Sequence, residues 1–111
     1  MANNKEKLAT LNEQMGAYGE ASPKMMGAFM ELHHIGGEDG ALSAKHKELI
    51  ALGIAIRIQC EGCIVAHVHD ALKAGATHDE IVETIGVAVY MGGGPCLVYG
   101  SKALEALKDF E

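Results

Sequence analysis

The chain has 111 residues, which is enough for one domain over residues 1–111 and too short for two domains of ordinary size. Fifteen Asp and Glu residues outnumber nine Lys and Arg residues, so the formal net charge is −6 at pH 7. This acidic balance argues against a nucleic-acid partner and against docking on an anionic membrane, because both need a basic surface.

The start of the chain does not have the pattern of a secretory or transit peptide, because residues 1–20 are polar and contain no continuous apolar stretch. The longest apolar run, Leu49 to Ile56, is far shorter than the roughly 20 residues that span a bilayer. Three cysteines are an odd number, which argues against a secreted scaffold held together by disulfides. We therefore expect a cytoplasmic protein.

Helix start and stop signals recur along the first half of the chain. Asn3 or Asn4 can cap a first helix that runs to about Tyr18. Ser22-Pro23 then predicts a second helix, with the serine as its cap and the proline at its first position. Gly36-Gly37 should end this helix.

The apolar residues of the second and third helices predict different surroundings. In the second helix they recur every three or four residues and should face the core or a subunit interface: Met25, Met26, Phe29, Met30 and Leu32. Ser43 should cap a third helix from Ala44 to about Gln59. The apolar residues between Leu49 and Ile58 point almost all round this helix, so we expect it to be buried at the centre.

Three more helices are expected, with approximate ranges 60–74, 78–91 and 96–108. Thr77-His78-Asp79-Glu80 has the pattern of a capping box for the fifth helix. Gly92-Gly93-Gly94-Pro95 separates it from the last one. The predicted fold class is therefore all-α, a single domain of about six helices joined by short loops.

Two apolar runs suggest an assembly of several copies. Leu49–Ile58 and Ile81–Tyr99 carry more apolar surface than one small bundle can easily bury. A large exposed apolar face usually marks an interface, so we expect a homo-oligomer. Cys96 has no partner nearby in the sequence and should be a buried small residue near such an interface.

The most informative segment of the chain is Cys60-Glu61-Gly62-Cys63, followed by His67. On a helix, Cys60, Cys63 and His67 fall within an arc of roughly 60°. A thiolate is the reactive form of cysteine, and a helix N-terminus or a neighbouring histidine favours it. The segment has no Ser, Thr, Asp or Asn cap, so the first N–H groups are free to face sulfur.

Glu48 is an acid next to a strongly apolar segment, and it could orient His67 and stabilise its cation. Such a set predicts a relay from carboxylate to imidazole to thiol, with a dithiol that can resolve a sulfenic acid into a disulfide. One alternative is a metal site in which Cys60, Cys63 and His67 are joined by Glu48 or His69. Against His69 stands its position opposite the cysteine face of the helix. A further alternative is a non-catalytic scaffold.

These residues resemble the carboxymuconolactone decarboxylase superfamily, in particular its alkylhydroperoxidase D-like branch. The resemblance covers about residues 20–105 and rests on a glutamate, eleven residues, Cys-x-x-Cys, three residues and a histidine. Glu48, Cys60, Cys63 and His67 fit this spacing. The segments 42–52, 74–77 and 92–95 also resemble the family.

The resemblance implies an all-helical subunit in a trimer or hexamer, with the site in a crevice near a subunit interface. Members with the cysteine pair reduce hydroperoxides or pass electrons to a peroxidase, with a glutamate and a histidine carrying protons. Peroxidase members often have a histidine directly before the second cysteine, where this chain has Gly62.

We therefore predict an enzyme, a thiol-dependent antioxidant oxidoreductase with Cys60, Cys63, His67 and Glu48 as catalytic residues. Its partners would be a hydroperoxide or disulfide substrate and a thiol electron donor. No organic cofactor is expected, because the chain has neither Gly-x-Gly-x-x-Gly nor a haem-attachment motif. The alternatives are a decarboxylase-like lyase, and a metal-binding or redox-sensing protein without catalysis.

Overall fold

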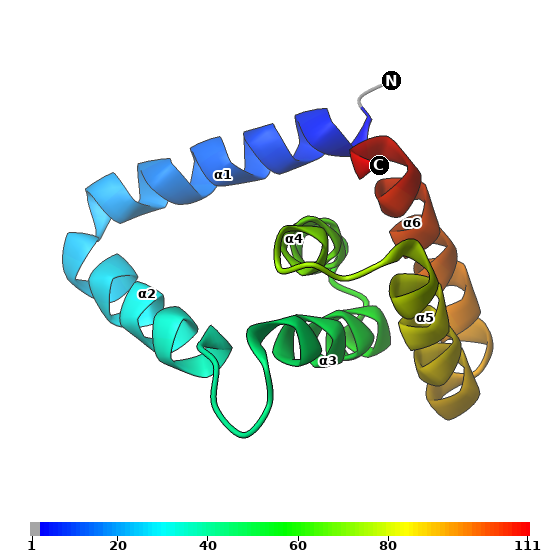
Figure 1. Cartoon of the computed structure of the whole chain (residues 1–111). Helices are drawn as coiled ribbons and strands as arrows, with labels where there is room; N and C mark the ends of the chain where they lie inside the picture. The colour runs from blue at the N-terminus through cyan, green and yellow to red at the C-terminus, as the bar shows by residue number, and fades with distance from the viewer. Residues whose placement is uncertain (1–2) are drawn as a thin grey trace.

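The computed structural model describes residues 3–111, and this part of the chain forms six α-helices and no strand (Figure 1). The helices are α1 (Asn4–Ala21), α2 (Pro23–Gly37), α3 (Ala44–Ile58), α4 (Glu61–Lys73), α5 (His78–Gly92) and α6 (Gly94–Phe110). The all-α prediction is confirmed. Within residues 3–111, no helix is both long and apolar enough to cross a membrane.

Most of the predicted helix starts are present. The side chain of Asn3 accepts the N–H of Glu6, and Ser43 caps α3 in the same way. Thr77 and Glu80 form the reciprocal capping box of α5. Ser22 is the N-cap of α2 and Pro23 is its first residue, as predicted, although the serine side chain makes no cap hydrogen bond. The backbone N–H of Ser22 also closes α1, which extends to Ala21.

Helices α3 to α6 form a packed body (residues 44–110), with α4 at the centre of the view and α5 beside α6 (Figure 1). Every buried hydrophobic side chain among residues 3–111 belongs to this body, and its largest fully buried members include Leu52, Ile56, Ile64, Ile81 and Leu107. Gly100 allows α5 and α6 to approach closely, since a Cβ there would lie 2.7 Å from Ile85. Cys96 is fully buried and free, as the sequence predicted.

Helices α1 and α2 form an arm (residues 4–37) that begins beside the C-terminal end of α6, passes round one side of α4 and returns toward the start of α3 (Figure 1). Its contact with the C-terminal end is polar, because the backbone and side-chain N–H groups of Asn4 donate to Asp109 at 2.9 and 2.8 Å. Of the two surroundings predicted for the apolar residues of α2, the core is excluded, since α2 has no buried residue. Phe29 and Leu32 are 54% and 66% exposed. The subunit interface proposed for the same residues stays a prediction.

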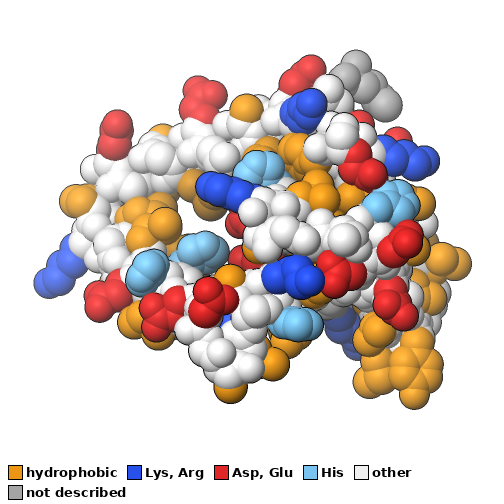
Figure 2. All heavy atoms as spheres, in the orientation of Figure 1, with side chains coloured by type: hydrophobic (Ala, Val, Ile, Leu, Met, Phe, Trp, Pro, Cys, Tyr) orange, Lys and Arg blue, Asp and Glu red, His pale blue; other side chains and the backbone are white. Residues whose placement is uncertain are grey.

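The expectation of full burial for α3 is also wrong. Leu52 and Ile56 are buried, but Ile50, Ile54 and Ile58 are 51–64% exposed. These three residues are four apart and share one helix face, which no described part of the chain covers. Figure 2 shows a second group of hydrophobic side chains where α5 ends and α6 begins.

Candidate functional site

The site begins at the junction of α3 and α4. Gln59 has φ 61° and ends α3 in the left-handed region, so that Cys60 directly precedes α4. Cys60, expected at the start of this helix, is its N-cap, and its Sγ accepts the backbone N–H of Cys63 at 3.3 Å. Sulfur therefore occupies the place that a capping oxygen would take, as the missing Ser, Thr, Asp or Asn predicted.

Cys60 and Cys63 are joined in a disulfide, with their Cα atoms 5.2 Å apart. Both residues are half-buried. The pair spans the first turn of α4, where backbone N–H groups lack helical acceptors and favour negative charge. A thiolate released from this disulfide would therefore lie in a stabilising field.

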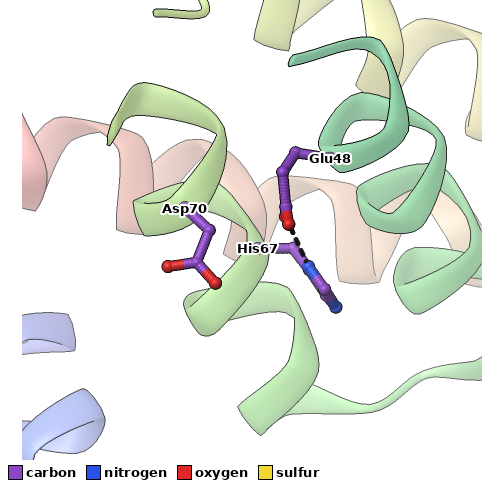
Figure 3. Close-up of side chains that lie close together, drawn as sticks. All are labelled: Glu48, His67 and Asp70. Carbon is purple, nitrogen blue, oxygen red and sulfur yellow. Dashed lines mark hydrogen bonds and ion pairs between the residues drawn. The ribbon is translucent and has the colours of Figure 1, made fainter. Parts of the chain in front are cut away.

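Glu48 and His67 meet across the α3–α4 contact. Oε2 of Glu48 lies 2.8 Å from Nδ1 of His67, and their side chains are 16% and 24% exposed. Figure 3 shows the carboxylate pointing from α3 toward the imidazole on α4. Because Nδ1 is held by the carboxylate, Nε2 is the nitrogen left to exchange a proton with another group.

A groove of about 920 Å³ lies between the arm and α4, and Figure 2 shows the opening between them. Its wall on the arm is largely apolar and includes Leu11, Met15, Met26, Phe29 and Met30. The disulfide, His67 and Asp70 line the opposite wall. The groove thus places an apolar surface directly beside the groups that can carry redox chemistry.

The model of the carboxymuconolactone decarboxylase family matches residues 23–106, a range that contains all four predicted site residues. The chain belongs to the carboxymuconolactone decarboxylase family. A solved apo structure of a family member from Legionella pneumophila has a TM-score of 0.93 and 41% identity, covering 96% of each chain. A second family structure, from Thermotoga maritima, has a TM-score of 0.82 but only 23% identity, covering 93% of this chain and 88% of that one. This more distant likeness shows the fold alone.

Two relatives of this family member have similar lengths. An uncharacterized protein of Cupriavidus necator is 40% identical over 100 residues, which is 90% of this chain and 88% of the relative. An uncharacterized protein from the cox locus of Paracoccus denitrificans is 36% identical over 97 residues, or 87% of each chain. The names of these relatives assign no reaction.

Sequence reasoning missed Asp70, which lies one turn beyond His67 on α4. A carboxylate oxygen of Asp70 lies within 4.8 Å of a carboxylate oxygen of Glu48 and of a ring nitrogen of His67. The spacing of Cys63, His67 and Asp70, four and then three residues, places them on one helix face and could have identified it. Two carboxylates and one imidazole could also act as ligands of a divalent cation. The cysteine-based metal set proposed from the sequence is not assembled here, because the two sulfurs are bonded to each other.

His69 was predicted on the opposite side of α4 from the cysteines, but it also borders the groove. Its Nδ1 lies 3.0 Å from Oδ1 of Asp70, and its ring meets Phe110 edge to face. His33, on the arm, lines the groove as well and stacks on Phe29. The groove could not be read from one helix alone, since three helices form it.

Gly62 has a packing role between the two cysteines. A Cβ at this position would lie 3.2 Å from Cδ2 of Leu11, so the absence of a side chain lets α1 approach α4 here. The adjacent Glu61 binds Lys102 at 2.9 Å, and this hydrogen bond and charge lower the pKa of Glu61. The negative charge that could oppose a thiolate is therefore paired with a lysine.

Proposed function

We propose that this family member is a thiol-dependent oxidoreductase that reduces hydroperoxides or exchanges disulfides through Cys60 and Cys63. One observation carries the proposal: the cysteine pair at the start of α4 lines the same apolar groove as His67, whose ring is held by Glu48. The pairing supplies a nucleophile, a resolving thiol and a proton carrier within one site.

In the oxidative half-reaction, one thiolate attacks the terminal oxygen of the hydroperoxide and the O–O bond breaks. The products are a sulfenic acid and an alkoxide, which takes a proton to become an alcohol. The second thiol then attacks the sulfenic sulfur, forming the disulfide and releasing water. Two thiols are oxidised, and one hydroperoxide is reduced to an alcohol and water.

His67 is the proposed proton carrier of these steps, and Glu48 the group that orients it. The carboxylate fixes Nδ1, so Nε2 can take the thiol proton and later return it to the leaving oxygen. Glu48 also stabilises the imidazolium that forms in between. A thiol donor, itself oxidised to a disulfide, must then reduce Cys60–Cys63 by thiol–disulfide exchange.

The test is a thiol count and intact mass on reduced, chelator-treated protein before and after one equivalent of cumene hydroperoxide. We expect rapid loss of two thiols and about two mass units, the change for one disulfide. Cys96→Ser is the matched control and should behave like the parent, whereas Cys63→Ser should form no internal disulfide. Thiols that stay unreactive at neutral pH would contradict the peroxidase proposal.

A double cysteine variant separates this proposal from the lyase that the family name suggests. A lyase should keep its activity in a Cys60→Ser, Cys63→Ser double variant, since neither sulfur takes part in decarboxylation. An oxidoreductase should lose all turnover. Retained turnover in the double variant would therefore move the assignment away from redox chemistry.

We also propose that the protein works as a homo-oligomer. Tyr90 and Met91 at the end of α5 are 84% and 73% exposed, and the exposed isoleucine face of α3 adds to this apolar surface. Large exposed apolar patches are typical of interfaces. Sedimentation at micromolar concentration should show a trimer or hexamer, and a monomer there would contradict the proposal.

A further inference from the structure

Three side chains from two helices converge where α3 packs against α4. One donor atom each of Glu48 on α3 and of His67 and Asp70 on α4 lie within 4.8 Å of one another (Figure 3). We propose that these three residues form a binding site for a divalent transition-metal cation of the Zn²⁺ type. The site is distinct from the cysteine chemistry, because its ligands are present while Cys60 and Cys63 are joined in their disulfide.

The donor set suits such a cation. An imidazole nitrogen combined with carboxylate oxygens fits Zn²⁺, whereas Mg²⁺ and Ca²⁺ prefer oxygen ligands alone. Oε2 of Glu48 and Nδ1 of His67 are 2.8 Å apart. This is close to the roughly 3 Å that separates two ligands when each is about 2.1 Å from one ion. His67 and Asp70 also line the groove, which gives an ion a path to the site.

The surroundings of the three ligands support the same assignment. The side chains of Glu48, His67 and Asp70 are only 16–37% exposed. Among the described residues, neither carboxylate is paired with a lysine or an arginine, since the lysine ion pairs are made with other acids. Two partly buried carboxylates without a cationic partner favour a bound cation.

His69 supplies the outer contact that a metal ligand usually has. Its Nδ1 lies 3.0 Å from Oδ1 of Asp70, and its ring is held edge to face against Phe110. Ligating carboxylates are commonly oriented by such hydrogen bonds from a second residue. The contact uses one oxygen of Asp70 and leaves the other for the ion.

Another histidine–carboxylate pair shows what is particular to this site. Nδ1 of His78 lies 2.7 Å from Oε1 of Glu111, a contact much like that of His67 with Glu48. Within residues 3–111, only the His67 pair is joined by a third donor from a histidine, cysteine or acid. The His78 pair is therefore a matched control that has the contact but lacks the site.

The experiment is a calorimetric titration of Zn²⁺ into the chelator-treated full chain in its disulfide form, which keeps Cys60 and Cys63 from binding the metal. We expect one Zn²⁺ per chain. Asp70→Asn and His67→Gln should each weaken binding by about tenfold or more. His78→Gln should bind Zn²⁺ like the parent. Thermal unfolding of each metal-free variant checks that the fold is retained.

A second readout places the ion. In spectra of protein with ¹⁵N-labelled histidine, Zn²⁺ should shift the ring signals that are missing in His67→Gln and leave those of His78 in place. Mg²⁺ at the same concentration should shift neither. Parental affinity in either ligand variant, equally tight binding of Mg²⁺, or no binding of Zn²⁺ would overturn the site. No hydroperoxide takes part in these measurements, so their result does not depend on the proposed function.

Discussion

The arm and the body of this protein are built from equally helical sequence but are held in place by different forces. The body contains all the buried apolar side chains of the described chain, whereas α1 buries only Asn4 and α2 buries nothing. Helix formation therefore does not by itself decide where a helix packs. Burial of apolar side chains holds the body together. The arm is held by the polar contact of Asn4 with Asp109 and by the close approach of Leu11 on α1 to Gly62 on α4.

Because of this difference, the body and the arm contribute different parts of the candidate site. Glu48, Cys63 and His67 lie on α3 and α4, where the core holds the backbone. The arm supplies the apolar wall that a bound molecule would touch. The rate of thiol oxidation should therefore depend mainly on residues of the body, and the affinity for an apolar substrate mainly on residues of the arm.

The largest expected effect is on stability. Leu52→Ala in the fully buried core should lower the free energy of unfolding by about 2–5 kcal/mol, because it removes buried methyl groups and leaves a cavity. Leu32→Ala, the same change on the exposed face of α2, should cost less than about 1 kcal/mol. Urea unfolding measures both values. Equal losses would show that the arm is packed as tightly as the body.

The next effect is on the rate of thiol oxidation. His67→Gln removes the proton carrier and should slow the step by about 10²-fold or more, with little change in the unfolding midpoint. His46→Gln, at an exposed position in the first turn of α3, is the matched control and should react like the parent. Stopped-flow thiol loss at neutral pH measures the rates. A parental rate in His67→Gln would remove the relay.

A smaller effect is expected when the arm is made more polar. Met26→Gln keeps the length of the side chain but places an amide on the apolar wall of the groove. The KM for cumene hydroperoxide should rise several-fold while kcat stays near the parental value, since uniform binding is lost. Hydrogen peroxide, which has no apolar part, is the control substrate and should show no such rise. A fall in kcat alone would place the arm in the chemistry.

The smallest effect concerns the polar anchor of the arm. Hydrogen bonds from the backbone N–H of Asn4, and then from its side chain, lower the pKa of Asp109 below its ordinary value. A lowered pKa stabilises the folded state above the ordinary pKa, and this contribution is lost as the pH falls through the lower one. The protection of the first turn of α1 against hydrogen exchange, measured relative to the intrinsic exchange rate at each pH, should therefore fall below about pH 4, ahead of that of the body. Asp109→Asn should abolish this dependence, and equal protection at pH 5 and 3 would contradict the mechanism.

Local signals in the sequence predicted the elements well. The caps at Asn3, Ser43 and Thr77 marked the starts of three helices, because a cap depends only on residues three positions apart. The Cys-x-x-Cys spacing predicted a pair that can form a disulfide, and the apolar excess predicted exposed faces. The contact between Glu48 and His67 was predicted from the family resemblance and from the chemistry of a proton relay, and not from helical periodicity.

The features that the sequence did not reveal all depend on contacts between distant elements. Ile50, Ile54 and Ile58 look as apolar as Leu52, and only the arrangement of the other helices decides which face is covered. The groove needs α1, α2 and α4 together, so His69 and His33 were not expected on its walls. Asp70 becomes a candidate site residue only because the packing of α3 against α4 brings Glu48 close to it.

The contact between Asn4 and Asp109 also bears on the order in which the molecule folds. It joins residues 105 positions apart, so its formation must wait until nearly the whole chain is available. Contacts of such long sequence separation carry a loop-closure cost and tend to form late. The arm, although made first on the ribosome, should therefore dock last. A nascent chain would hold its cysteines at the start of α4 before the groove around them exists.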